Sequence, residues 1–223
     1  MLFDLHLHSN NSPDARTKPE TIIKICKKKG FGVSITDHAS MGAYFSNNSV
    51  LKLAKKEGVF LIPGEELRVL KNDRYAADLI AYFLNKEIPP KTFPEILDEV
   101  KSQGALLSCP HPFDWPRTNF KDFPKQWKKF DCVEVFNARA YYDGLNSKSQ
   151  KFAEGKKIAR LGVSDAHTPE EIGNGLTEID ALTESEFRKE IKKQRTKVII
   201  GGRAGLWHHF QTQLAERNLV KDK

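Results

Sequence analysis

The chain has 223 residues, a mass of 25.4 kDa and a formal net charge of +7. Its composition of 39% hydrophobic and 29% charged residues is typical of a soluble protein, and no apolar run approaches the ~20 residues of a membrane span. The first residues do not resemble a secretory signal, and three cysteines without a CxxC pair argue against a disulfide framework. Membrane, secreted and collagen-like classes are excluded, and we expect a cytoplasmic protein.

Short apolar runs alternate with amphipathic stretches, a pattern that predicts βαβ units around a mainly parallel sheet. Expected strands cover residues 1–7, 31–36, 59–63, 105–109, 132–136, 158–163, 176–179 and 197–200, with two more strands inside 67–84. Expected helices cover residues 19–29, 44–57, 92–103, 144–156, 184–194 and 206–217. No linker is long enough to divide the chain, so the sequence predicts one domain.

Five of the seven histidines lie at or just beyond the end of an expected strand, each in a short polar cluster: His6, His8, His38, His111 and His167. In parallel α/β proteins the loops that follow the strands meet on one face of the molecule, where active sites lie. The sequence therefore predicts that these histidines share one pocket.

The residue types in these clusters indicate a metal site. His6 and His8 are two residues apart on a strand, so both side chains point to the same face and can bind one ion. Further carboxylates stand beside the histidines, where they can bind metal or orient a ring: Asp4, Asp37, Glu65, Glu66 and Asp165. Nitrogen and oxygen ligands without thiolates favour Zn²⁺, Mn²⁺ or Fe²⁺ over Ca²⁺.

Six motifs resemble the PHP (polymerase and histidinol phosphatase) family, in the family's order and over most of the chain: DLHLHSNNSPD, GFGVSITDH, IPGEE, CPHPF, VEVFNAR and GVSDAH. The resemblance implies an α/β fold, a distorted (β/α)7 TIM-like barrel in a single domain, with two or three metal ions in its mouth. Residues 1–175 would form the barrel with the metal site. Residues 176–223 would be a PHP-associated segment that completes the same domain.

The resemblance also implies ligands at matching positions. One ion would be held by His6, His8, Glu66 and Asp165, a second by Glu66 and His111, and a third by Asp14, His38 and His167. The chain departs from the family at Asp78, where a histidine is usual. Asp78 can bind the same ions with a shorter reach, or the second site is weak, or Asp78 is only a carboxylate at a strand edge.

Closely spaced ions can activate a water molecule as hydroxide and neutralise a phosphoryl group, so the chain is predicted to hydrolyse phosphate esters. We expect Glu66, Asp165 and Arg139 to be catalytic. The planar fork of Arg139 can also grip two phosphate oxygens, and Arg16 and Arg203 are further candidates for substrate binding.

Residues 112–116 form an aromatic, proline-rich loop that could stack a base or shape the pocket, with loop packing as the alternative. His208 and His209 are expected to be packing or surface groups. The preferred substrate class is a small phosphomonoester or nucleotide. A nuclease acting on nucleic-acid ends, an amidohydrolase-like enzyme and a scaffold without catalysis remain alternatives, and the sequence leaves the metal and the oligomeric state open.

Overall fold

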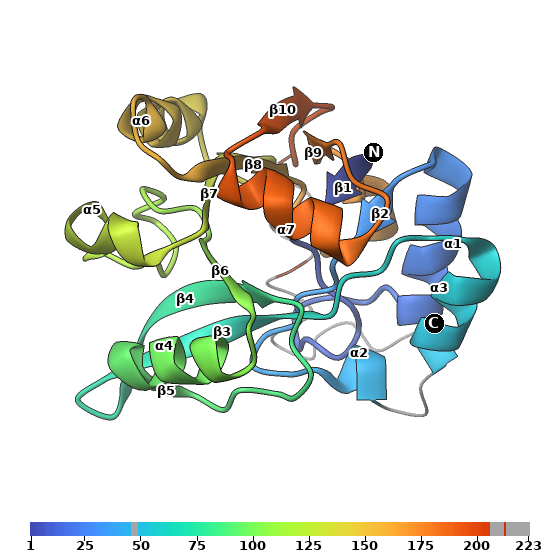
Figure 1. Ribbon diagram of the computed structural model, residues 1–223, viewed down its shortest axis with the longest axis horizontal. Coiled ribbons are helices and arrows are strands. Elements are labelled where there is room, and N and C mark those ends of the chain that lie inside the picture. Colours follow the sequence, from blue (N-terminus) through green and yellow to red (C-terminus); the bar gives the residue numbers. More distant parts are fainter. Residues whose placement is uncertain (46–48, 206–211, 213–223) are drawn as a thin grey trace.

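The strands of the computed structural model, which describes residues 1–45, 49–205 and 212, form two sheets in the orders β10-β9-β1-β2 and β5-β3-β4-β6-β7-β8 (Figure 1). The strands are β1 (Leu2–Asp4), β2 (Gly32–Val33), β3 (Gly64–Lys71), β4 (Arg74–Tyr82), β5 (Lys91–Thr92), β6 (Leu106–Cys109), β7 (Cys132–Asn137), β8 (Ala159–Val163), β9 (Gly175–Ile179) and β10 (Thr196–Ile200). β9 pairs with β1, so the segment after residue 175 shares a sheet with the first strand of the chain.

Parallel bridges join the two sheets into a ring. Leu7 pairs with Ala166, beyond the end of β8, and Val33 of β2 pairs with Leu61, just before β3. The ring runs β1, β2, β3, β4, β6, β7, β8 and back to β1. β4 is antiparallel to both of its neighbours, whereas the other pairs in the ring are parallel. The predicted distorted seven-stranded barrel is therefore confirmed, with one strand reversed.

Most helices lie around the outside of the strands, whereas α7 crosses the centre of the view in front of them (Figure 1). They are α1 (Pro19–Lys29), α2 (Gly42–Phe45), α3 (Ser49–Glu57), α4 (Phe93–Ser102), α5 (Phe123–Gln126), α6 (Asp143–Ala153) and α7 (Glu184–Lys192), with short 3₁₀ turns at Trp127–Lys129 and Pro169–Glu171. α1 begins with a proline and ends at Gly30, whose φ of 77° suits a residue without a side chain. None of the helices within the described ranges is long and apolar enough to cross a membrane.

Several expected elements differ from the structure, among them the expected strands 1–7 and 31–36, which are shortened to β1 and β2. The expected strand at 59–63 is reduced to a single bridge at Leu61, and the regular strand begins at Gly64. The bridge consists of two backbone bonds, from the N–H of Val33 to the carbonyl of Phe60 and from the N–H of Ile62 to the carbonyl of Val33. The expected helix 44–57 is helical over Gly42–Phe45 and Ser49–Glu57. The expected helix 206–217, including His208 and His209, lies outside the described residues except for Thr212.

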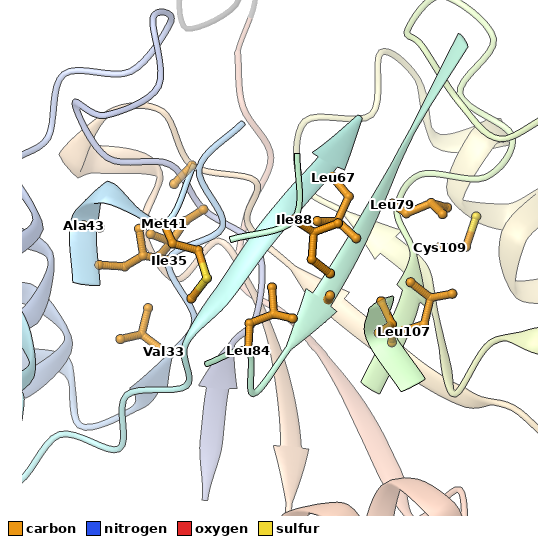
Figure 2. Close-up of a cluster of buried hydrophobic side chains, with 14 of the residues drawn as sticks. Val33, Ile35, Met41, Ala43, Leu67, Leu79, Leu84, Ile88, Leu107 and Cys109 are labelled. Atoms are coloured by element: carbon orange, nitrogen blue, oxygen red, sulfur yellow. The ribbon is translucent and has the colours of Figure 1, made fainter. Parts of the chain in front are cut away.

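The core consists of two layers, and alternation along the strands separates them. On β4, Ile80 and Tyr82 belong to an inner cluster with side chains of β1, β6 and β8, whereas Leu79 and Ala81 belong to an outer cluster under the helices. Figure 2 shows part of this outer cluster around β3 and β4, including Leu67, Leu79 and Leu107. Phe187 and Ile191 of α7 contribute to the inner cluster.

Candidate metal centre

The inward-facing rows of the barrel end in carboxylates at the mouth. On β8 the apolar series Ala159, Leu161 and Val163 lies in the inner cluster, and Asp165 follows two residues later. On the reversed strand β4 the row from Tyr82 through Ile80 continues to Asp78. Because β4 runs antiparallel to its neighbours, its N-terminal half lies at the mouth, where the parallel strands end.

The first predicted ligand set lies together. Nε2 of His6 and Nε2 of His8 are 3.1 Å apart, and each lies 3.4–3.5 Å from Oε2 of Glu66. Oδ1 of Asp165 lies 3.5 Å from both nitrogens. Two ligands bound ~2.1 Å from one ion at 90–110° are about 3.0–3.5 Å apart. The donor set and its spacing therefore fit a divalent cation.

Glu134 orients His6 and holds the backbone of His111, a role that was not predicted from the sequence. Oε1 of Glu134 accepts a hydrogen bond from Nδ1 of His6 at 2.7 Å, so Nε2 of His6 is the nitrogen left to bind metal. Oε2 of Glu134 accepts bonds from the backbone N–H of His111 and from Asn137. Glu134 is buried on β7 two residues after Cys132, and a charged residue in an apolar strand was the available signal.

Replacing Glu134 by Gln should weaken metal binding about 10- to 100-fold, the usual effect of losing an orienting partner of a metal-bound histidine. The amide keeps the size of the side chain but removes the negative charge that holds the His6 tautomer. Titration of the metal-free protein with Zn²⁺ or Mn²⁺ measures the effect. Glu178→Gln, an exposed strand carboxylate paired with Lys197, is the matched control. Equal affinities for wild type and Glu134→Gln would contradict this role.

His8 and His167 are oriented in the same way. Nδ1 of His8 donates to Oγ of Ser12, whose own hydroxyl donates to Asp37. Nδ1 of His167 donates to the carbonyl oxygen of Asp165 at 2.8 Å. Both rings therefore present Nε2 to the centre. Burial, together with the nearby His167 and His38, lowers the pKa of His8 to about 3, so His8 is neutral and able to bind a cation.

A second group lies next to the first. Oδ2 of Asp14 is 3.1 Å from Nε2 of His167 and 3.3 Å from Nε2 of His38, and His8 completes the group. Nδ1 of His38 is 3.0 Å from Oε2 of Glu66, so Glu66 lies between the two groups. The structure thus brings together Asp14, His38 and His167, as the family resemblance implied.

Asp78 lies inside the centre, within ligand distance of His38 and Glu66. Burial and the charge of Glu66 raise the pKa of Asp78 to about 6. Its Oδ2 accepts a bond from the Tyr75 hydroxyl, whereas its buried Oδ1 has no hydrogen-bond partner among the described residues. Nε2 of His111 lies 3.6 Å from Oε1 of Glu66, and its buried Nδ1 is also without such a partner in the described part of the chain.

The backbone is strained at two predicted ligands. His111 has a φ of 28° and Asp165 a φ of 55°, values that residues with side chains seldom adopt. Such strain persists where the surrounding structure fixes it, and it is common at functional sites. Two neighbours hold Asp165 in place, because its Oδ2 accepts hydrogen bonds from the side-chain amide of Asn137 and the guanidinium of Arg117.

The ligands open onto a cavity of about 230 Å³ that is also lined by two arginines. Arg139, which the sequence analysis expected at the mouth, lines the cavity; it is buried, and its guanidinium contacts Glu171 and Thr212. Within the described ranges the two other predicted arginines do not line the cavity. Arg16 is exposed, and Arg203 pairs with Asp143 beyond the outer strand β10.

Arg117 is the second arginine of the cavity and was not predicted. Its guanidinium bonds to Oδ2 of Asp165 at 2.5 Å and to Oδ2 of Asp114 at 2.8 Å. Burial opposes its charge, but Asp165 and Asp114 outweigh it and raise the pKa of Arg117 above its usual value. It follows the CPHPF motif in a long loop, where no sequence pattern distinguishes it from a surface arginine.

Comparison with known proteins decides the family. The model described as PHP domain matches residues 4–145, and the model described as PHP-associated matches residues 144–196. The chain belongs to the PHP family. A relative in Methanocaldococcus jannaschii, the uncharacterized protein MJ0417, is 34% identical over 189 residues, which cover 82% of this chain and 72% of that protein. The resemblance expected from the six motifs is confirmed.

Two solved structures share the PHP fold. One is a two-domain protein of Bacteroides vulgatus containing a predicted PHP-like metal-dependent phosphoesterase, with a TM-score of 0.71, 21% identity and coverage of 90% of this chain and 64% of that one. The other is the lesion-specific endonuclease Q of Pyrococcus furiosus, with a TM-score of 0.62, 20% identity and coverage of 89% and 58%. The chain thus spans less than two thirds of the length of either structure. Its fold is that of metal-dependent phosphoesterases of the PHP family.

Proposed function

We propose that this protein hydrolyses phosphate monoesters, of small-molecule or nucleotide type, at a centre of two or three divalent ions. The observation that carries this proposal is a buried set of histidine and carboxylate donors 3.0–3.6 Å apart that opens onto a cavity with two arginines. Buried carboxylates are costly without cations, and phosphoryl groups need positive charge in the transition state. Metal ions and arginines would meet both needs.

Glu66 is suited to serve two ions at once. Its Oε2 lies 3.4 Å from Nε2 of His8 on one side and 3.0 Å from Nδ1 of His38 on the other. When bound, the ions would lower the pKa of a coordinated water and neutralise phosphoryl oxygens. Zn²⁺, Mn²⁺ and Fe²⁺ all accept this mixture of nitrogen and oxygen ligands.

The arginines would bind and orient the phosphate. Arg139 enters the cavity from the loop after β7, and its guanidinium is held by Glu171 and Thr212. Arg117 enters from the loop after β6, and its bond to Asp165 places it next to the first ligand set. Two planar donors on different loops can each contact phosphate oxygens and fix the ester for in-line attack.

A nuclease is the second candidate. The fold is similar to that of endonuclease Q, and the net charge of +7 would favour a nucleic acid. The cavity of about 230 Å³ is smaller than the usual range of about 300–1,000 Å³ for ligand pockets, which favours a terminal phosphate over an internal phosphodiester.

The three cysteines are buried and unpaired, which suits the proposed cytoplasmic location.

The deciding experiment measures phosphate release from phosphomonoesters, nucleotides and short oligonucleotides, with Mn²⁺ or Zn²⁺ supplied. We expect release from monoesters by the wild type and none by His8→Ala, since His8 contacts both ligand groups. Release of nucleotides from oligonucleotide ends without phosphate release from monoesters would favour the nuclease. No turnover of any phosphate ester by a protein that holds its metal would contradict the proposal and leave the amidohydrolase-like and scaffold alternatives.

A further inference from the structure

Two exposed aromatic side chains are joined outside the barrel mouth. Trp115, in the loop after β6, is 72% exposed, and Tyr142, in the loop after β7, is 45% exposed. The indole Nε1 of Trp115 donates a hydrogen bond to the hydroxyl of Tyr142 at 2.5 Å, across 27 residues of sequence. This bond holds the edge of the indole and leaves most of its flat apolar surface open to a ligand.

The aromatic pair adjoins the cavity through both of its loops. Tyr142 is the next residue after Tyr141, which lines the cavity, and Trp115 is two residues before Arg117, which also lines it. Adjacent Cα atoms are about 3.8 Å apart. The Cα of Tyr142 therefore lies about 4 Å from that of Tyr141, and the Cα of Trp115 lies at most about 7–8 Å from that of Arg117. A phosphate at Arg117 and a planar group at Trp115 would therefore be close enough to belong to one molecule.

We propose that Trp115 and Tyr142 bind the base of a nucleoside monophosphate whose phosphate enters the metal cavity. The proposal rests on the proposed phosphatase function and names its substrate class. The indole of Trp115 offers a flat apolar surface on which a nucleobase can stack, and a nucleotide carries such a base together with a phosphate. The hydrogen bond to Tyr142 holds the indole in place before the ligand arrives, so binding orders little.

Stacking depends on the flat ring system of a base and not on the donors and acceptors along its edge. The indole N–H already donates to Tyr142, so Trp115 has no donor left to distinguish one base from another. We therefore expect purine and pyrimidine nucleotides to be accepted, with purines preferred because their larger ring system buries more area.

The test compares adenosine 5′-monophosphate with ribose 5-phosphate, which carries the same phosphate and sugar but no base. Trp115→Ala should lower kcat/KM for the nucleotide by about 5- to 150-fold, the range for one stacked base, and leave ribose 5-phosphate unchanged. Tyr142→Phe keeps the ring and should cost less. Phe45→Ala removes a 48% exposed aromatic that does not line the cavity, and it should change neither substrate.

The two proposals fail in different ways. If the wild type hydrolyses both compounds and Trp115→Ala changes them equally, the base site is wrong and the phosphatase function stands. If the wild type hydrolyses neither, the function is wrong, and calorimetric titration with adenosine 5′-monophosphate tests the base site separately. Weaker nucleotide binding by Trp115→Ala would then support the site, and unchanged binding would overturn it.

Discussion

Replacing Asp165 by Asn should lower the rate of phosphate release by about 10²–10³-fold, because a group that holds charge at the reacting centre is lost. Oδ1 of Asp165 faces Nε2 of both His6 and His8, and Oδ2 binds Arg117, so one carboxylate supports the metal ligands and the arginine together. His6 and Arg117 outweigh burial and hold the pKa of Asp165 well below its usual value, so this side chain is ionised. The amide has the same shape but no charge to offer a cation.

The measurement is phosphate release together with metal content by elemental analysis. Asp143→Asn is the matched control, because Asp143 is exposed and pairs with Arg203 outside the cavity. We expect Asp165→Asn to lose both metal and activity while its thermal unfolding stays cooperative. Full activity in Asp165→Asn with metal bound would show that this carboxylate is not part of the centre.

Replacing Arg117 by Ala should lower kcat/KM by about 10²-fold, the order expected for removing one charged donor to a phosphoryl group. Arg117→Lys should recover only part of the loss, because a lysine keeps the charge but cannot bind Asp165 and Asp114 with a planar fork. Steady-state kinetics on the best monoester of the panel measures both variants. A higher KM with unchanged kcat would indicate that Arg117 binds the phosphate. A lower kcat together with weaker metal binding would indicate that Arg117 positions Asp165.

Arg188→Ala is the matched control for Arg117. Arg188 is also a partly buried arginine in an ion pair, with Glu184 on α7, and it does not line the cavity. Unchanged kinetics and metal affinity in Arg117→Ala would contradict both roles. Arg117 would then have only a structural role, as the partner of Asp114 in an ion pair that stabilises the loop.

Asp78 illustrates how one reversed strand changes a prediction. From the sequence, Asp78 could be a ligand, a weak substitute for histidine or a carboxylate at a strand edge. The structure places it beside Glu66 and His38, because β4 runs against its neighbours and brings its N-terminal half to the mouth. A parallel arrangement of the same strand would have placed Asp78 at the opposite end of the barrel.

For the predicted arginines, the tertiary structure decides which one reaches the cavity. Arg139 and Arg203 both follow strands, so the sequence makes both of them candidates for the mouth, with Arg139 preferred. Only Arg139 follows a strand of the ring, whereas Arg203 follows β10, which pairs with β9 at the edge of the smaller sheet. Sequence patterns identify strands and their ends, but they do not say which strands close a ring.

The sequence by itself determined the alternation of strands and helices and the position of five histidines at strand ends, because these depend on local periodicity and on polar residues where strands end. Its six motifs determined the family, and the resemblance to that family implied the barrel and the ligand set. Only the tertiary structure decided that Glu134 orients His6, that Arg117 reaches Asp165 and that Trp115 meets Tyr142. Each of these contacts joins residues 27 to 128 positions apart. Such contacts depend on strand order and loop path, which no local pattern of residues encodes.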